Sequence, residues 1–487
     1  MGTSKGAKLV ETAKSIILVV LFLFTILLLY FFWGSTPIKD LIRENPPQYG
    51  AVDPAAVMRP DFTSICFGGN SYTVAADKFD MVMDCFREFS ASRNLSIEEI
   101  AKERYDEVER SPSIKAVFGY FAPFGAFCEI HGIDRIPGVD SVETLSELVY
   151  AADYDDRLYA ADAKAKKYYR VTGSSNSCFD LLKDEIGSAE KSSTAYFTLT
   201  TYMGGEIDND ALCPVSFESG IRDVHYYPDD FSKQGDKPRN MIRSFFSDNF
   251  DFVKRIEEKN GTVIYMYGYG RTVVIAHNNG VLEFKREDDE RAGSQARYAD
   301  ALEKASSFIA AHGAFESIDG INLTPYIKEV VPDPEGKKGF RFVFGVEING
   351  SRVYYQSGEP VIIDVTGGRV SYYKRDLVNV FSNELGAAGG DYREAFSAIN
   401  LLAGNLEYVK GALEETKQAG AGEISSIEGL VERVSRFDCG YLRSAENTGS
   451  LEAAWVVTIG GLEFYFGLDD GKPLGYRPIF VAGDSPR

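Results

Sequence analysis

An uncharged run of 18 residues, Ile16 to Trp33, constrains this chain more than any other feature. Fifteen of the 18 are Leu, Ile, Val or Phe, and the others are Thr25, Tyr30 and Trp33. At about 1.5 Å per residue, a helix of this length measures about 27 Å, close to the thickness of a hydrocarbon core. The run therefore predicts a transmembrane helix over residues 15–34. A cleaved signal peptide is the alternative, but its apolar stretch is shorter and ends in a small-residue cleavage site, which "WGSTPIKD" lacks.

The residues on either side of the run predict its orientation. Residues 1–14 carry three lysines against one glutamate, and a positively charged flank stays on the cytoplasmic side. We therefore expect a single-pass protein of the cell membrane, with a cytoplasmic N-terminal tail at 1–14 and an extracellular C-terminal region. Prolines crowd residues 35–58, which predicts a semi-extended stalk.

The predicted membrane helix also offers a surface for a partner helix. Helices in lipid have no hydrophobic drive to associate, so side-chain packing and a few polar groups select the partner. Thr25 is the small polar side chain in mid-span, and Phe22 and Leu29 are bulky neighbours that shape the surface. We predict that these three residues contact a partner helix. The alternative is that the Thr25 hydroxyl bonds its own helix backbone, as threonines within helices commonly do.

Composition limits what the outer region does. The formal net charge is -20, from 52 Lys and Arg against 72 Asp and Glu. A nucleic-acid partner needs a basic footprint, so none is expected. The 28 Tyr and 33 Phe favour many half-buried strands over a helical bundle.

The six cysteines form no C-x-x-C motif, which argues against zinc and thioredoxin-like sites. An even number outside the cell is compatible with disulfides. Cys66, Cys85 and Cys128, however, fall in apolar segments, where cysteine often acts as a small hydrophobe. The sequence therefore favours free thiols and leaves the redox state open.

Turn and periodicity signals divide the outer region into three predicted domains. These are a mixed α/β domain at 59–190, a second domain at 191–290, and a C-terminal domain at 291–487 with two units of helix plus β-meander. Apolar residues at helical spacing predict a core-facing helix early in the first domain; they are Phe79, Val82, Met83, Phe86 and Phe89. The meanders are predicted to turn at glycine pairs and Asn-Gly or Asp-Gly pairs; these are 268–270, 279–280, 349–350, 367–368, 460–461 and 470–471. Helices packed on antiparallel meanders make an α+β fold.

A search for catalytic patterns finds none. The sequence has no G-x-S-x-G nucleophile elbow, no H-E-x-x-H zinc helix and no G-x-x-x-x-G-K-[ST] phosphate loop. The four histidines, at 131, 225, 277 and 312, are scattered, whereas metal binding and general-base chemistry need partners brought together. We therefore predict no catalytic, cofactor-binding or metal-binding residues, no cofactor and no enzyme activity.

Five segments carry a family resemblance. In chain order they are "MRPDFTSICFGGNSYTV", "VIYMYGYGRTVVIAHNNGVLEF", "FIAAHGAF", "RFVFGVEINGSRVYYQSGEPVIIDVTGGRVSYYKRDL" and "AAWVVTIGGLEFYFGLDDGKPL". With the N-terminal anchor, they resemble the YycH family, membrane-anchored extracytoplasmic regulators of an essential two-component system in Gram-positive bacteria. The fourth segment looks like a meander that these proteins and the sister YycI family share with PepSY-type modules, and the fifth looks like the last strands of YycI.

This resemblance implies a non-catalytic protein that modulates a sensor histidine kinase governing cell-wall metabolism. The implied partners are that kinase, a YycI-like membrane protein and the lipid bilayer. Two other hypotheses remain open on the residues alone. One is a cell-surface hydrolase of wall polymers, with a carboxylate pair among the many acidic residues. The other is a sensor ectodomain whose aromatic-rich sheets bind a small molecule. The oligomeric state is left open.

Overall fold

The computed structural model describes residues 17–26, 49–75, 77–91, 95–154, 158–173, 177–189, 194–231, 236–287, 296–316, 321, 323–380, 392–418, 422, 424–445 and 449–479. The chain divides into two compact units, Met1–Gln48 and Tyr49–Arg487. In the first unit, residues 17–26 are helical. Within the described residues, no helix is long and apolar enough to cross a membrane. The remainder of the predicted span lies outside them, including Leu29.

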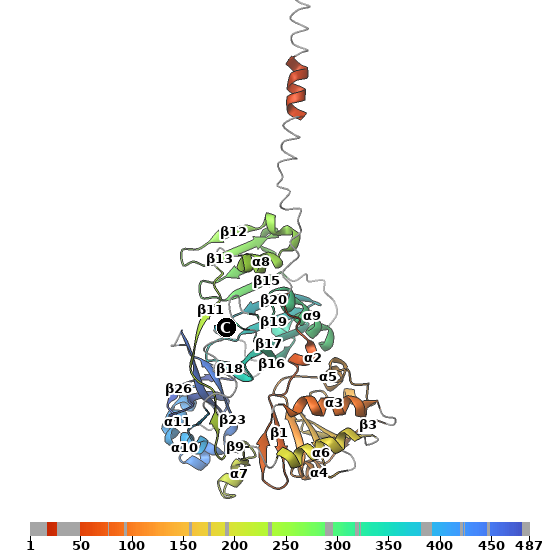
Figure 1. Ribbon diagram of the computed structural model, residues 1–487, viewed down its shortest axis with the longest axis vertical. Coiled ribbons are helices and arrows are strands. Elements are labelled where there is room, and N and C mark those ends of the chain that lie inside the picture. Colours follow the sequence, from red (N-terminus) through yellow and green to blue (C-terminus); the bar gives the residue numbers. More distant parts are fainter. Residues whose placement is uncertain are drawn as a thin grey trace, which may run out of the picture. The chain divides into compact units, whose positions relative to one another are not determined.

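The second unit begins with an antiparallel sheet, to which the described residues contribute nine strands in the order β3-β7-β6-β5-β4-β1-β2-β8-β9. Of these, β1, β3 and β9 are labelled in Figure 1. The strands are β1 (Phe62–Cys66), β2 (Tyr72–Val74), β3 (Ser96–Ile100), β4 (Ser113–Val117), β5 (Glu147–Ala151), β6 (Leu158–Asp162), β7 (Lys167–Thr172), β8 (Tyr196–Thr198) and β9 (Leu212–Pro214). Strands β8 and β9 extend this sheet beyond residue 190, and the domain limits at 190 and 290 stay predictions.

Helices cover the two faces of this first sheet unequally. Helices α3 (Lys78–Ser90), α5 (Phe124–Ile130) and α6 (Ser177–Ala189) belong to the main core on one face. On the other face, α4 (Lys102–Glu109) packs over β5 and β6 in a smaller apolar cluster. Helix α4 also contacts β4 and β7, and the same face of the sheet borders the site described below.

A second sheet holds fifteen of the described strands, nearly all antiparallel. They are β11 (Val224–Pro228), β12 (Lys254–Glu257), β13 (Val263–Tyr267), β14 (Thr272–Ala276), β15 (Leu282–Arg286), β16 (Thr324–Pro332), β17 (Gly339–Ile348), β18 (Ser351–Tyr355), β19 (Val361–Thr366), β20 (Arg369–Arg375), β21 (Val378–Val380), β23 (Val434–Arg443), β24 (Ser450–Ile459), β25 (Leu462–Gly467) and β26 (Pro473–Pro478). Strands β18 and β23 pair in parallel. Two short strands, β10 (Glu218–Ser219) and β22 (Arg393–Glu394), pair separately.

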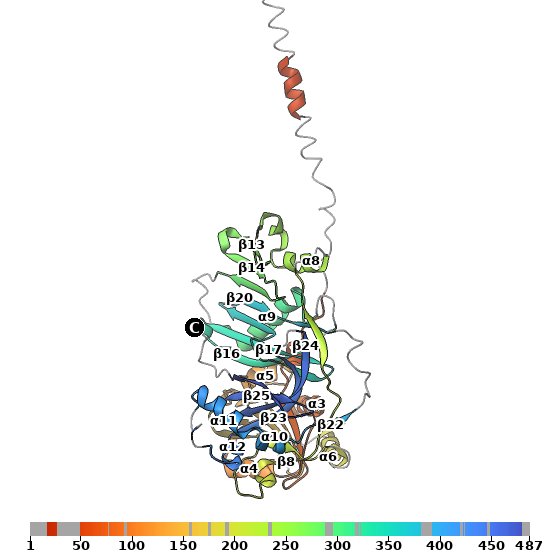
Figure 2. The same cartoon turned by 90° about the vertical axis from the view of Figure 1, so that its left-hand side faces the viewer.

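The remaining helices lie on the second sheet and at the β8–β9 edge of the first. Helix α9 (Tyr298–Ala311) contacts β17, β19 and β20 (Figure 2). The other described helices are α2 (Pro54–Val57), α7 (Leu199–Tyr202), α8 (Asp236–Ser244), α10 (Ala398–Gly404), α11 (Leu406–Glu415) and α12 (Ile427–Val431). The predicted α+β class with antiparallel sheets is confirmed.

The local signals that were strongest in the sequence are confirmed. All five predicted core residues of helix α3 are buried, from Phe79 at 3% to Phe86 at 0% exposure. Each predicted meander turn joins two paired strands. In the β17–β18 turn, Asn349 and Gly350 have φ of 50° and 80°. Two-residue hairpin turns of type I′ need such positive φ at both central positions, which Asn and Gly tolerate best.

Three segments differ from the element that their local sequence pattern predicts. The apolar run over 114–130 predicts a strand, but residues 124–130 form helix α5, because an apolar run without alternation does not distinguish a strand from a buried helix. The pattern around "ELVYA" predicts a helix, but this segment is strand β5, and both of its faces are covered. The pattern over 240–258 predicts one helix, but α8 ends at Ser244, and β12 follows as an additional strand.

The cysteine prediction is wrong for one pair. Cys85 on α3 and Cys178 on α6 form a disulfide, and the residues lie 93 positions apart in the chain. The other four cysteines are free, as predicted, and three of them are buried. The disulfide joins two helices on the same face of the first sheet, a contact that the apolar character of each segment does not reveal.

Candidate functional site

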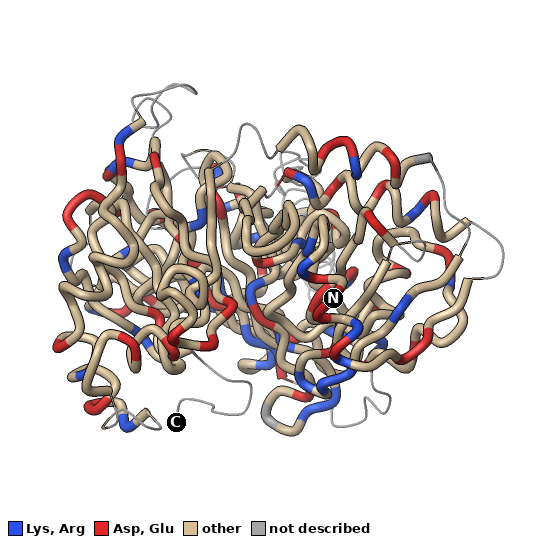
Figure 3. Tube along the Cα trace, turned by 90° about the horizontal axis from the view of Figure 1, so that it is seen from below, with Lys and Arg blue, Asp and Glu red and all other residues tan. Residues whose placement is uncertain are grey.

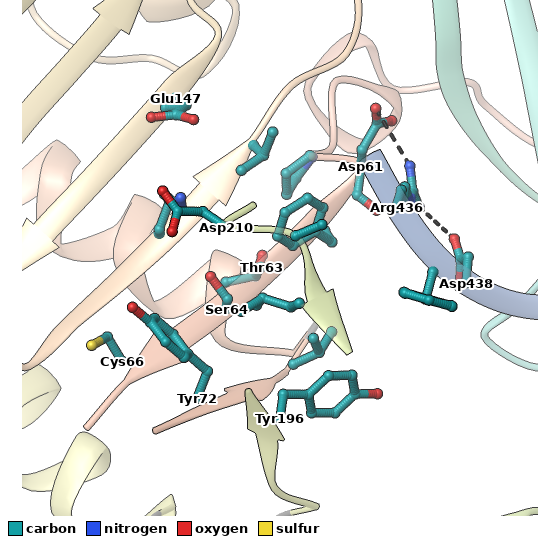
Figure 4. A pocket seen from close by; sticks show the side chains of 18 of the residues that line it. Asp61, Thr63, Ser64, Cys66, Tyr72, Glu147, Tyr196, Asp210, Arg436 and Asp438 are labelled. Atoms are coloured by element: carbon teal, nitrogen blue, oxygen red, sulfur yellow. Dashed lines mark hydrogen bonds and ion pairs between the residues drawn. The ribbon is translucent and has the colours of Figure 1, made fainter. Parts of the chain in front are cut away.

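A cavity of about 910 Å³ lies between the face of the first sheet that carries α4 and part of the second sheet. Its walls come from β1, β2 and β4 on one side and from β17, β18 and β23 on the other. Figure 4 shows side chains of β1, β2 and β23 among those that line the cavity. This volume is within the range of small-molecule sites, which measure roughly 300–1,000 Å³. The cavity is therefore the candidate site.

One wall holds a cluster of charged side chains, Asp61, Arg352, Arg436 and Asp438, which we call the charged cluster. Figure 4 labels three of them, Asp61, Arg436 and Asp438. Arg352 Nη1 lies 3.9 Å from both Asp61 Oδ1 and Asp438 Oδ2. Arg436 Nη1 lies 3.7 Å from Asp61 Oδ2, and Arg436 Nη2 bonds Asp438 directly. The arginines also donate to the main-chain carbonyls of Pro60 at 3.3 Å and Asp61 at 3.2 Å. The cluster therefore ties the start of β1 to the second sheet.

Strand periodicity positions the members of the charged cluster. Residues i and i+2 of a strand face the same side. Arg352 and Tyr354 of β18 therefore share one side, and so do Arg436 and Asp438 of β23. The Tyr354 hydroxyl donates to Asp438 Oδ2. The parallel pairing sets Arg352 opposite Gly440, where a Cβ would lie 2.3 Å from the Arg352 carbonyl oxygen, so a larger residue there would force these strands apart.

Tyr326 completes the support of Arg352. The Arg352 guanidinium lies 4.4 Å from the centre of the Tyr326 ring, a cation–π distance. The Tyr326 ring in turn lies against Gly345, where a Cβ would come within 2.2 Å of Tyr326 Cζ. A glycine on β17 therefore makes room for the ring that supports the arginine.

Two carboxylates beside Arg352, those of Asp438 and Glu347, have pKa values shifted in opposite directions. Burial opposes ionisation of Asp438, but the charges of Arg436 and Arg352 outweigh it, so its pKa lies below the usual value. Burial raises the pKa of Glu347, and Arg352 offsets only part of that effect. Opposite shifts are a feature of acid–base pairs in hydrolases. Both carboxylates, however, lie within 4 Å of Arg352, the geometry of a structural ion-pair network, and we do not assign them catalytic roles.

The opposite wall carries Cys66, Tyr72, Lys115, Glu147 and Tyr105. Burial raises the pKa of the Cys66 thiol, which keeps it protonated and a weak nucleophile at neutral pH. Lys115 is paired with Glu109. Burial alone would lower the Lys115 pKa, but the neighbouring Glu109 and Glu147 raise it above its usual value, so the amine stays charged. This wall offers charged and hydrogen-bonding groups to a ligand.

The residues predicted from sequence to contact a membrane partner lie elsewhere. The Thr25 hydroxyl donates to the Leu21 carbonyl at 2.8 Å, as the alternative interpretation expects. Phe22 is 65% exposed in the described helix, and Leu29 lies outside the described residues. Their contact with a partner stays a prediction.

The four histidines are not brought together. His131 and His312 are buried among aromatic rings, with Phe127 4.4 Å and Phe308 4.0 Å away between ring centres. Burial lowers the pKa of each to about 4. Within the described residues, no group of three His, Cys, Asp or Glu side chains is placed to hold a metal ion. Lys and Arg are interspersed with Asp and Glu along the chain (Figure 3).

Comparison with known proteins identifies a structural relative. No family model matches the sequence. No curated protein matches it. The structure is similar to that of YycH from Bacillus subtilis, with a TM-score of 0.57 at 10% sequence identity, over 89% of this chain and 98% of that chain.

Two further structures give lower scores. An uncharacterized protein from Eubacterium rectale has a TM-score of 0.32 at 13% identity, over 53% of this chain and 81% of its own. The C-terminal domain of YpeB from Bacillus megaterium has a TM-score of 0.27 at 12% identity, over 50% of this chain and 96% of its own. These scores are too low to support an argument. The similarity to YycH shows that the chain has a YycH-like fold. The YycI-like and PepSY-like features of its C-terminal part stay predictions.

Proposed function

We propose that this chain is an extracytoplasmic regulator that modulates a sensor histidine kinase of a two-component system controlling cell-wall metabolism. The observation that carries the proposal is the YycH-like fold, which extends over 89% of this chain and nearly all of YycH. The regulatory role is the one that the sequence resemblance to the YycH family implies. The role is non-enzymatic, and its partners are the kinase and a YycI-like membrane protein.

Two features support an extracytoplasmic, membrane-anchored location. The apolar run at 16–33 is long enough for a membrane anchor, and the lysines before it favour a cytoplasmic N-terminus. The Cys85–Cys178 disulfide is of a kind that persists in oxidising compartments outside the cytoplasm. An alkaline phosphatase fused after Arg487 is expected to be active outside the cell and to stay with the membrane fraction. A soluble exported fusion would contradict the anchor.

The regulatory role is tested by phosphorylation of the response regulator in cells. Deletion of the gene is expected to change the phosphorylated fraction of the cognate regulator, and expression of the wild-type protein is expected to restore it. Co-purification of the kinase and of a YycI-like protein with a tagged chain from solubilised membranes tests the partners. An unchanged phosphorylated fraction in the deletion strain would contradict the proposal.

Replacing residues 16–33 with leucines tests whether the apolar run contributes to regulation beyond anchoring the protein in the membrane. This replacement keeps a membrane anchor but removes the side-chain pattern around Thr25, Phe22 and Leu29. We expect kinase output to change at equal membrane abundance. Thr25→Val is the matched single change, and because the Thr25 hydroxyl bonds Leu21, we expect a smaller effect from it than from the full replacement. Parental output in both variants would assign regulation to the outer domains.

A further inference from the structure

The wall of the cavity has a surplus of negative charge. Nine Asp and Glu residues and six Lys and Arg residues line it, which leaves three negative charges in excess. Five of the six cationic side chains already lie within 4 Å of a carboxylate; they are Arg59, Lys102, Lys115, Arg352 and Arg436. The sixth, Arg110, is exposed. An anionic ligand would therefore meet cationic groups that are mostly neutralised and carboxylates that repel it.

Two carboxylates of the wall, those of Asp208 and Asp210, are available to a ligand. Both are exposed and line the cavity, and neither has an ion-pair or hydrogen-bond partner for its side chain among the described residues. The residue between them fixes the loop. Asn209 Nδ2 donates to the carbonyls of Val431 and Val434, both at 2.7 Å. The pair is thus held in place before a ligand arrives, which lowers the entropic cost of binding.

The same wall presents aromatic rings, ten in all. The rings of Tyr168 and Tyr326 already lie against protein cations, with Lys102 Nζ 6.0 Å and the Arg352 guanidinium 4.4 Å from the ring centres. Ring faces attract cations through their quadrupole. The wall therefore combines a surplus of negative charge with ring faces, and both favour a cationic ligand.

We propose that this cavity binds an organic cation with primary ammonium groups, such as a lysine-containing peptide or a polyamine. Asp208 and Asp210 accept hydrogen bonds from the ammonium groups, and the aromatic rings of the wall contact the aliphatic part. The volume of about 910 Å³ accommodates a molecule of peptide or polyamine size. The proposal does not depend on the regulatory role, because binding is measured on the protein alone.

Trp455 provides the signal for a binding experiment. The sequence has two tryptophans, Trp33 and Trp455, and Trp455 lines the cavity. In the full-length Trp33→Phe protein in detergent, tryptophan fluorescence therefore reports on the cavity alone. Trilysine and spermidine are titrated at 0.15 M salt, which screens weak surface attraction to within about 8 Å. At least one is expected to give a saturable fluorescence change, and calorimetry measures the same affinity. Tighter binding of trilysine would indicate a peptide ligand, and tighter binding of spermidine a polyamine.

Two controls test the recognition of charge. Fully acetylated trilysine keeps the length but loses the ammonium charges, and we expect it to bind at least tenfold more weakly. The double variant Asp208→Asn, Asp210→Asn is expected to weaken binding tenfold or more. Its matched control is Glu206→Gln, Glu218→Gln, which removes two exposed charges near the site but outside the wall. We expect less than a twofold change in this control.

Three results would overturn the proposal. The first is the absence of saturable binding of both amines to the parent protein. The second is equal binding of acetylated and unmodified trilysine. The third is an equal loss of affinity in the wall variant and in its matched control. That result would mean that binding depends on the net charge of the protein and not on Asp208 and Asp210. Circular dichroism of each variant confirms that the fold is retained, because the substituted carboxylates lack protein partners.

Discussion

The charged cluster makes a sharp prediction about stability, through the substitution Asp438→Asn. The Asp438 carboxylate accepts hydrogen bonds from Arg436, from Tyr354 and, at 2.9 Å, from the Cys439 amide. Asparagine keeps an oxygen for the neutral donors but removes the charge that balances two arginines. Removing one member of a buried ion pair costs about 3–5 kcal/mol, and an exposed pair contributes about 1 kcal/mol or less.

The expected loss lies between these limits. The side chains of Asp438 and Arg352 are 25% and 12% exposed, and Asp61 still lies within 4 Å of both arginines after the substitution. We therefore expect Asp438→Asn to lower the free energy of unfolding by about 2–3 kcal/mol at pH 7. Because the folded-state pKa of Asp438 is depressed, its contribution is present above about pH 4 and is lost as the pH falls through the folded pKa.

Urea unfolding, followed by circular dichroism and by Trp455 fluorescence, measures this change. The slope of the free energy against urea is expected to stay constant, so the loss appears as a lower midpoint. Asp469→Asn, in the exposed turn after β25, is the control and is expected to stay within about 0.5 kcal/mol of the parent protein. The difference between parent and Asp438→Asn is expected to be constant from pH 5 to 8. A loss below about 0.5 kcal/mol at pH 7 would refute the role assigned to this carboxylate.

Three further predictions concern the turns, the disulfide and the histidines. Gly461→Val places a branched side chain at φ of 89° and is expected to cost about 1 kcal/mol or more, whereas Gly187→Ala, within helix α6, is expected to be neutral or stabilising; thermal unfolding compares them. Cys178→Ser opens a long covalent loop and is expected to cost about 2–5 kcal/mol, and reductant is expected to destabilise the parent protein but not this variant. His131 and His312 are neutral when buried, so stability is expected to fall between about pH 6.5 and 4, by at most about 1.4 kcal/mol per pH unit for each, and His131→Phe is expected to flatten this slope. Equal unfolding temperatures for the two glycine variants, an unchanged midpoint in reductant, or a pH slope unaffected by His131→Phe would each contradict the corresponding argument.

The sequence predicted those parts of the fold that local chemistry decides. The Asn349–Gly350 turn requires positive φ at both positions, and few other residue pairs allow it. The apolar stripe of helix α3 repeats at helical spacing and is buried as expected. The prediction for the β5 segment was wrong because both faces of this strand are covered, so the alternating pattern of a half-buried strand is missing.

The candidate site was not predicted, because its walls come from distant parts of the chain. Arg436 reaches the carbonyl of Asp61 across 375 positions, and Arg352 reaches that of Pro60 across 292. No local pattern encodes such a pairing. A signal was nevertheless present in strand β23, where Arg436 and Asp438 occupy alternate positions on either side of Phe437. Charges on one face of a strand in a large sheet require partners, since burying them unpaired is costly.

That signal identifies a charged face on β23 but not the strand that it pairs with. The partner is β18, which lies beside β23 in parallel. Parallel neighbours need a long connection, and here 78 positions separate Tyr355 from Arg433, so the pairing leaves no trace in adjacent sequence. Its register sets Arg352 opposite Gly440, two residues beyond Asp438. Shifting that register by one residue would turn one charged face away from the other, because side chains alternate along a strand. The charged wall of the cavity therefore depends on a single strand register, and Gly440, at which a Cβ would meet the Arg352 carbonyl, helps to specify it.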